Sequence, residues 1–140
     1  MTAPALQGLA PSAREVDRLD GAPVILARDA SQWEAWLADH HQKPAGAWLM
    51  IAKKHTGVTT VTQPEALDGA LCFGWIDSVR RSLDATYYLQ KYSRRRRGSA
   101  WSAINANRAE ALAAARRMRE AGLAEVERAM AAGRFSDRLQ

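Results

Sequence analysis

The sequence predicts a small α+β protein: a mixed, mostly antiparallel sheet with flanking helices and a helical C-terminal part. Three observations favour this class. Residues 47–52 are almost all apolar, residues 75–92 have the two-residue period of paired strands, and residues 101–133 are rich in alanine. These patterns are typical of a strand buried on both faces, of a β-hairpin and of helices, in that order.

The length of 140 residues predicts a single domain. We expect a flexible leader over residues 1–23, one folded domain over residues 24–135 and a short tail over residues 136–140. The leader has neither the basic start nor the apolar stretch of a secretory signal. No run approaches the roughly 20 apolar residues of a membrane span. The single cysteine favours a reducing compartment, so we expect a cytoplasmic protein.

Local signals place the elements of the first half. We expect a strand over residues 24–27, then a helix over residues 31–40 that is opened by Ser31 and Glu34. Residues 58–61 are rich in β-branched side chains and fit a short strand.

A second helix is predicted after Thr62, which forms a capping box with Glu65, and Gly74 is placed to end it. From there residues 75–83 and 86–92 alternate as two strands of a hairpin.

The C-terminal part is expected to be helical. One long helix is predicted over residues 101–119 with a break at Gly122. A last helix places Leu123, Val126 and Met130 on one side and ends at Gly133.

Positive charge is concentrated in the second half of the chain. The net charge is +5, and residues 77–140 carry fourteen Lys or Arg against seven Asp or Glu. Four consecutive arginines occupy residues 94–97. This asymmetry predicts an acidic partner or an anionic ligand at one end of the molecule.

The predicted helix that begins at Trp101 carries an irregularity. Asn105 and Arg108 lie at helical spacing from Trp101, on the stripe that should be apolar. Leaving a buried amide or guanidinium unpaired costs about 1–3 kcal/mol, so we expect Asp77 on the hairpin to act as the partner. Two interpretations stay open: a structural network between helix and hairpin, or the polar floor of a ligand pocket.

The arginine run is open to several interpretations as well. Forked guanidinium groups bind phosphate or carboxylate, and Gly98 and Ser99 before a helix add N–H groups and a positive dipole end. The bland alternative is a solvated basic loop. We favour a small anionic ligand; the alternatives are a nucleic acid bound by residues 94–97 and an enzyme that acts on a small anionic substrate.

The sequence contains no recognisable catalytic, cofactor or metal-binding motif. His40 and His41 are adjacent and point to different faces, which makes a poor chelate. Cys72 stands among apolar neighbours, which favours a buried thiol over a nucleophile. We therefore expect no cofactor and no metal, and we assign no catalytic residue.

Several motifs occur together in a characteristic order. They are W-E-x-W-L at residues 33–37, G-x-W-L at 46–49, A-L-C-F-G-W-I-D at 70–77 and R-R-x-G-S-x-W-S at 95–102. In this order and spacing, residues 24–135 resemble the YdeI/OmpD-associated family, also called bacteriocin-protection proteins. The resemblance implies a bacterial protein linked to tolerance of bacteriocins, and it brings no established reaction or cofactor.

The motif residues that match the family coincide with the polar stripe and the arginine run. With Arg108 added, the candidate ligand-binding residues are Lys54, Trp75, Asp77, Arg95, Arg96, Ser99, Trp101, Asn105 and Arg108. We thus expect a non-catalytic cytoplasmic protein for binding or stress tolerance, with its anion pocket near Asp77, Trp101 and Asn105.

Two departures from the family pattern have consequences. Family members usually carry proline at the position of Arg94, so the loop is expected to be less rigid and more cationic here. They usually continue into a further helical segment, whereas this chain stops at Gln140. The shorter end is expected to expose an apolar surface suited to a homodimer.

Overall fold

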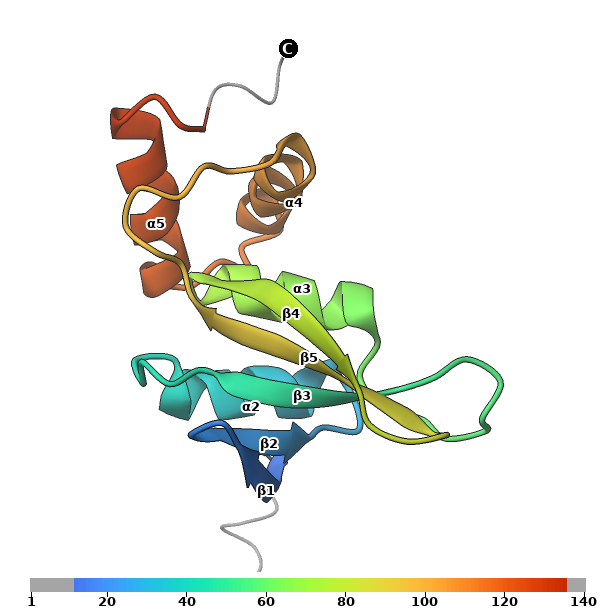
Figure 1. Cartoon of the computed structure of the whole chain (residues 1–140). Helices are drawn as coiled ribbons and strands as arrows, with labels where there is room; N and C mark the ends of the chain where they lie inside the picture. Colours follow the sequence, from blue (N-terminus) through green and yellow to red (C-terminus); the bar gives the residue numbers. More distant parts are fainter. Residues whose placement is uncertain (1–11, 136–140) are drawn as a thin grey trace, which may run out of the picture.

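The computed structural model describes residues 12–135 and confirms the α+β class. Within that range five strands form one mixed sheet, and four helices accompany it (Figure 1). The strands are β1 (Arg14–Leu19), β2 (Ala22–Leu26), β3 (Ala47–Ala52), β4 (Trp75–Ser82) and β5 (Tyr87–Arg94). The helices are α2 (Ala30–His40), α3 (Gln63–Cys72), α4 (Ala103–Ala114) and α5 (Glu120–Ala131).

The order of strands across the sheet is β1-β2-β3-β5-β4, so β1 and β4 form its edges. β2 and β3 run parallel, with α2 in the connection between them, and the other neighbours are antiparallel. Helices α2 and α3 cover one face, where they bury Leu49 and Tyr92 of the sheet. Helices α4 and α5 lie beyond β4 (Figure 1), and the candidate site forms where β4 meets α4.

The expected leader is wrong over residues 14–23, because this segment forms the hairpin of β1 and β2. The turn between these strands has φ of 52° at Asp20 and 79° at Gly21. Two positive φ values are typical of a type I′ turn, for which Asp-Gly is a preferred pair. The side chains of β1 are mostly exposed, so no apolar alternation indicated a strand. Residues 1–11 of the leader and the tail over residues 136–140 lie outside the described residues.

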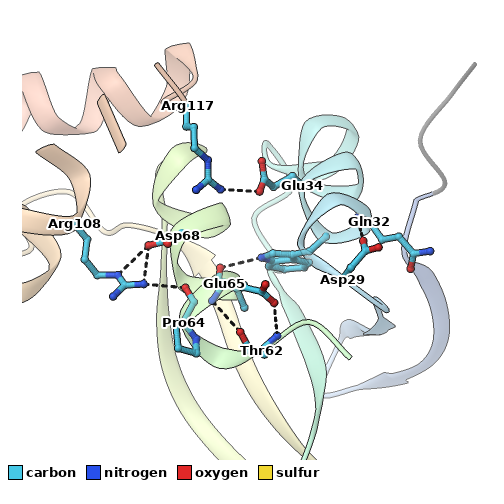
Figure 2. Close-up of polar contacts among 11 residues, drawn as sticks. Asp29, Gln32, Glu34, Thr62, Pro64, Glu65, Asp68, Arg108 and Arg117 are labelled. Carbon is cyan, nitrogen blue, oxygen red and sulfur yellow. Dashed lines mark hydrogen bonds and ion pairs between the residues drawn. The ribbon is translucent and has the colours of Figure 1, made fainter. Parts of the chain in front are cut away.

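The N-terminal ends of helices α2 and α3 are capped by side chains that accept hydrogen bonds from backbone N–H groups of the first turn. The predicted capping box of Thr62 and Glu65 is confirmed at α3 (Figure 2). At α2 the expected cap at Ser31 is wrong, because Asp29 Oδ1 accepts the hydrogen bond from Gln32 N–H at 2.9 Å. An aspartate is as good a cap as a serine, so the sequence preference alone does not distinguish Asp29 from Ser31.

The expected short strand over residues 58–61 is wrong, and the segment is a loop. Its polar groups bind to neighbouring elements instead. Thr60 Oγ1 accepts a hydrogen bond from Ala52 N–H at 2.9 Å, and Val61 N–H donates to Ala27 O at 3.0 Å. These bonds hold the loop at the end of β3.

The expected long helix over residues 101–119 is also wrong, because α4 already ends at Ala114. Arg116 adopts a left-handed backbone with φ of 61°, and Arg117 N–H donates back to Leu112 O at 2.9 Å. Such a left-handed residue closes a helix at its C-terminus. Arginine has a high helix propensity, so the sequence contains no indication that the helix ends before Arg116.

Gly122 is not a break but the third residue of α5. Arg119 N–H donates to Cys72 O at 2.9 Å, which sets the start of α5 against the end of α3. Leu123 and Met130 are exposed, so the predicted apolar side of the last helix is only partly buried. No helix among residues 12–135 has the length and apolarity needed to cross a membrane.

Candidate functional site

An open groove of about 540 Å³ lies where the edge strand β4 meets the start of α4. We call it the β4–α4 groove. Strand β4 contributes residues 76–78, β5 and the following loop contribute its basic side chains, and α4 contributes its first turn. The groove is lined by Ile76, Asp77, Ser78, Lys91, Ser93, Arg94, Arg95, Arg96, Ser99, Ala100, Ser102 and Asn105.

The groove brings together only part of the predicted site. The candidates that line it are Asp77, Arg95, Arg96, Ser99 and Asn105. Trp75 and Trp101 do not line it, because both are buried in the core with exposed fractions of 0% and 6%. Lys54 lies elsewhere, in a groove beside the loop over residues 53–62. Asn105 is half-buried and faces the hairpin, in agreement with the sequence-based expectation.

The expected pairing of Arg108 with Asp77 is wrong. Arg108 Nε and Nη2 lie 2.9 Å and 2.7 Å from Asp68 Oδ1, and Nη2 also donates to Pro64 O at 3.0 Å (Figure 2). Both partners belong to α3, so Arg108 attaches α4 to α3 rather than to the hairpin. The structural interpretation therefore holds for Arg108.

Arg95 differs from the other arginines of the run in being buried, with 8% of its surface exposed. Its guanidinium carbon lies 3.8 Å from the centre of the Trp101 ring, and Nη2 donates to Ala100 O at 3.2 Å. Nε and Nη1 are buried and have no hydrogen-bond partner within residues 12–135. An unpaired buried donor costs about 1–3 kcal/mol, and native proteins keep few of them.

Two carboxylates act on the charge of Arg95. Burial lowers the pKa of its guanidinium, while Glu125 of α5 and Asp77 of β4 act in the opposite direction. Arginine stays protonated at neutral pH because the ordinary pKa of its guanidinium lies far above neutral. Burial, and then Asp77, raise the pKa of Tyr92, whose hydroxyl is also buried without a partner in the described chain.

A second, much smaller cavity adjoins Arg95 on the side of α5. Its volume is about 20 Å³, and its lining includes Trp101, Glu125 and Ala129. A space of roughly 10–15 Å³ or more of this kind holds one water molecule. Phosphate is too large for this cavity, whereas the β4–α4 groove on the other side of Arg95 has room for one.

The backbone donors of the loop are less available than the sequence suggested. Ser99 N–H donates to Arg96 O at 3.1 Å and closes a turn. Asn105 N–H donates to Ser102 Oγ at 3.1 Å, which makes Ser102 the cap of α4. The N–H groups of Ala103 and Ile104 have no acceptor within the helix, because a helix leaves its first turn unpaired. The positive end of α4 thus borders the groove.

Sequence reasoning missed Lys91, Ser93 and Ser102, which line the same groove. Ser102 stands three residues before Asn105, the spacing of an N-cap, and this signal was available. Lys91 and Ser93 are two residues apart in β5 and therefore share one face of the strand. That this face lies close to α4 depends on the tertiary fold and could not be read from the sequence.

The remaining reactive side chains do not form a second centre. Cys72 is a buried thiol, as predicted, and burial raises its pKa to about 11. Within residues 12–135 no three His, Cys, Asp or Glu side chains are grouped so that they could hold a metal ion.

Comparison with known proteins gives one match. A family model described as a domain of unknown function (DUF8412) matches residues 25–125, which include every lining residue of the β4–α4 groove. No curated protein and no solved structure matches the chain.

Proposed function

We propose that this chain, which belongs to the DUF8412 family, binds a small anionic ligand in the β4–α4 groove. The observation that carries the proposal is Arg95, whose Nε and Nη1 are buried and unpaired beside an open basic groove. Hydrogen bonds from a guanidinium to carboxylate or phosphate are charge-assisted and about twice as strong as neutral ones. A bound anion that reaches these atoms, after a small shift of the groove surface, would supply the missing acceptors.

The other groove residues fit distinct roles. Arg96 is exposed and Lys91 half-exposed, so they attract an anion without a large desolvation cost. Asn105 offers an amide donor at the positive end of α4. Asp77 acts on Arg95 at longer range, which keeps the guanidinium charged and in place.

In this proposal the protein is a non-catalytic binding protein that contributes to stress tolerance. The resemblance to the YdeI/OmpD-associated family supports that role, and we propose membership of that wider group on the motifs at residues 70–77 and 95–102. The chain's single, buried thiol supports a cytoplasmic location.

Inorganic phosphate should raise the melting temperature of the protein. At tenfold excess over the dissociation constant the gain is about 1.4 kcal/mol, or about 3–6 °C for a domain of this size. Arg96→Ala and Asn105→Ala should reduce this rise by at least half. The matched variants Arg97→Ala and Asn107→Ala change exposed neighbours that do not line the groove. In these variants phosphate should raise the melting temperature as much as in the parent chain. Sodium chloride at equal ionic strength controls for screening.

An equal phosphate effect in all four variants would place the anion elsewhere and contradict the proposal. The nucleic-acid alternative predicts a different pattern. Duplex DNA held by the whole run over residues 94–97 would lose affinity equally in Arg96→Ala and Arg97→Ala, with a slope near −0.9 per phosphate in log affinity against log salt.

A further inference from the structure

A second open groove lies beside the loop over residues 53–62, at the opposite end of the hairpin from the arginine run (Figure 1). We call it the loop groove. Its volume is about 640 Å³, which is within the roughly 300–1,000 Å³ of small-molecule sites. The loop and the start of α3 form its walls, and Ile51, Arg80 and Tyr88 come from the sheet.

The walls of the loop groove are held in place by hydrogen bonds. Lys53 N–H donates to Thr86 O at 2.8 Å, and Lys53 Nζ donates to Asp84 O at 2.6 Å, at the tip of the hairpin. Thr56 Oγ1 donates to Lys53 O at 3.0 Å within the loop. Together with the bonds of Thr60 and Val61, these contacts fix both ends of the loop, so the groove is largely preformed.

The lining of the loop groove is basic and rich in hydroxyl groups. Lys53, Lys54 and Arg80 line it together with four threonines, and no Asp or Glu is among its lining residues. Lys54 is exposed, and its ammonium group has the reach and charge to bind a phosphate. The chemistry of the groove therefore favours an anion.

Arg80 and Tyr88 add a flat surface to this groove. The guanidinium carbon of Arg80 lies 4.4 Å from the centre of the Tyr88 ring. Arg80 Nε donates to Gln90 Oε1 at 3.4 Å, and Gln90 is 3% exposed and itself donates to Val79 O at 3.1 Å. The buried amide thus holds the guanidinium against the ring. Since Arg80 is exposed, its other face is open to a flat ligand ring, which stacks well on a guanidinium.

We infer that the loop groove binds a phosphorylated ligand that carries a flat aromatic ring, for which a mononucleotide is the simplest probe. The ring stacks on Arg80, the phosphate binds Lys54, and the hydroxyl of the exposed Thr59 forms a hydrogen bond to the ligand. This site is separate from the β4–α4 groove and does not depend on the function proposed for it.

Calorimetric titration of the full chain with AMP, adenosine and ribose 5-phosphate tests the inference. AMP should bind at least about tenfold more tightly than either fragment, because stacking and phosphate contact each contribute about that factor. Arg80→Ala should weaken AMP about tenfold and leave ribose 5-phosphate nearly unchanged. Lys54→Ala should weaken AMP and ribose 5-phosphate but leave adenosine nearly unchanged.

The matched control is Arg81→Ala. Arg81 is the next residue of β4, but its guanidinium carbon lies 5.1 Å from the centre of the Trp48 ring, outside the loop groove. AMP affinity should be the same in this variant as in the parent chain, with melting temperatures confirming that each variant is folded.

Three results would overturn the inference: no AMP binding at millimolar concentration, equal affinity for AMP and ribose 5-phosphate, or full AMP affinity in folded Arg80→Ala. A thymidine oligonucleotide that binds more tightly with increasing length, and whose binding also requires Arg80, would show a groove for single strands and overturn the mononucleotide assignment.

Discussion

Replacing Gly122 by alanine should destabilise the protein by about 3 kcal/mol or more. An ideal Cβ at this position would lie 2.3 Å from Cys72 O and 2.7 Å from Leu71 O. Both contacts are with backbone at the end of α3, which cannot move aside as a side chain can. The expected loss is opposite to the usual effect, because replacing glycine by alanine within an exposed helix normally increases the free energy of unfolding by about 1 kcal/mol.

Chemical denaturation measures this effect as a shift in midpoint at constant slope. Gly98→Ala is the matched control, since a Cβ there meets no atom within 4 Å and only the positive φ of 83° is strained. That variant should lose about 1 kcal/mol. A Gly122→Ala protein as stable as the parent chain would show that α5 does not pack on α3 as described.

The largest functional effect is expected for Arg95→Met. The stabilisation by phosphate should be lost, because the variant removes the buried guanidinium. The stability of the phosphate-free protein should stay within about 1 kcal/mol or increase, because replacing a poorly paired buried charge by an apolar side chain is often neutral or favourable. Methionine also packs well against an aromatic ring, here that of Trp101.

Thermal and chemical unfolding with and without phosphate measure both quantities, and Arg97→Met is the exposed control. A loss of more than about 2 kcal/mol in Arg95→Met without phosphate would show that Arg95 is kept for stability. That result would contradict the proposal that the buried guanidinium of Arg95 is kept to bind an anion.

Local signals predicted much of the fold. The apolar run at residues 47–52, the hairpin after Gly74 and the capping box of Thr62 and Glu65 all depend on neighbours a few residues apart. The Asp-Gly pair at residues 20 and 21 is a local turn signal as well. The hairpin was nevertheless not predicted, because the residues of β1 are mostly polar and exposed.

Partners that are distant in the sequence could not be predicted in the same way. Periodicity correctly assigned Arg108 to a face that packs on the protein, but the choice of Asp68 over Asp77 depends on how α4 lies on α3. The start of α5 is likewise set by Arg119 N–H donating to Cys72 O, a contact that the alanine-rich sequence does not indicate. The motif at residues 95–102 predicted a basic site, whereas the burial of Arg95 follows from the ring of Trp101 and the position of α5.

The most direct test of anion binding at Arg95 observes its side-chain Nε–Hε group by ¹H–¹⁵N NMR during a titration with phosphate. The account predicts a saturable change in the chemical shift of Arg95 Nε–Hε, with the same dissociation constant as the rise in melting temperature, and no comparable change for the exposed Arg97. An Arg95 signal that does not move while phosphate stabilises the protein would contradict it.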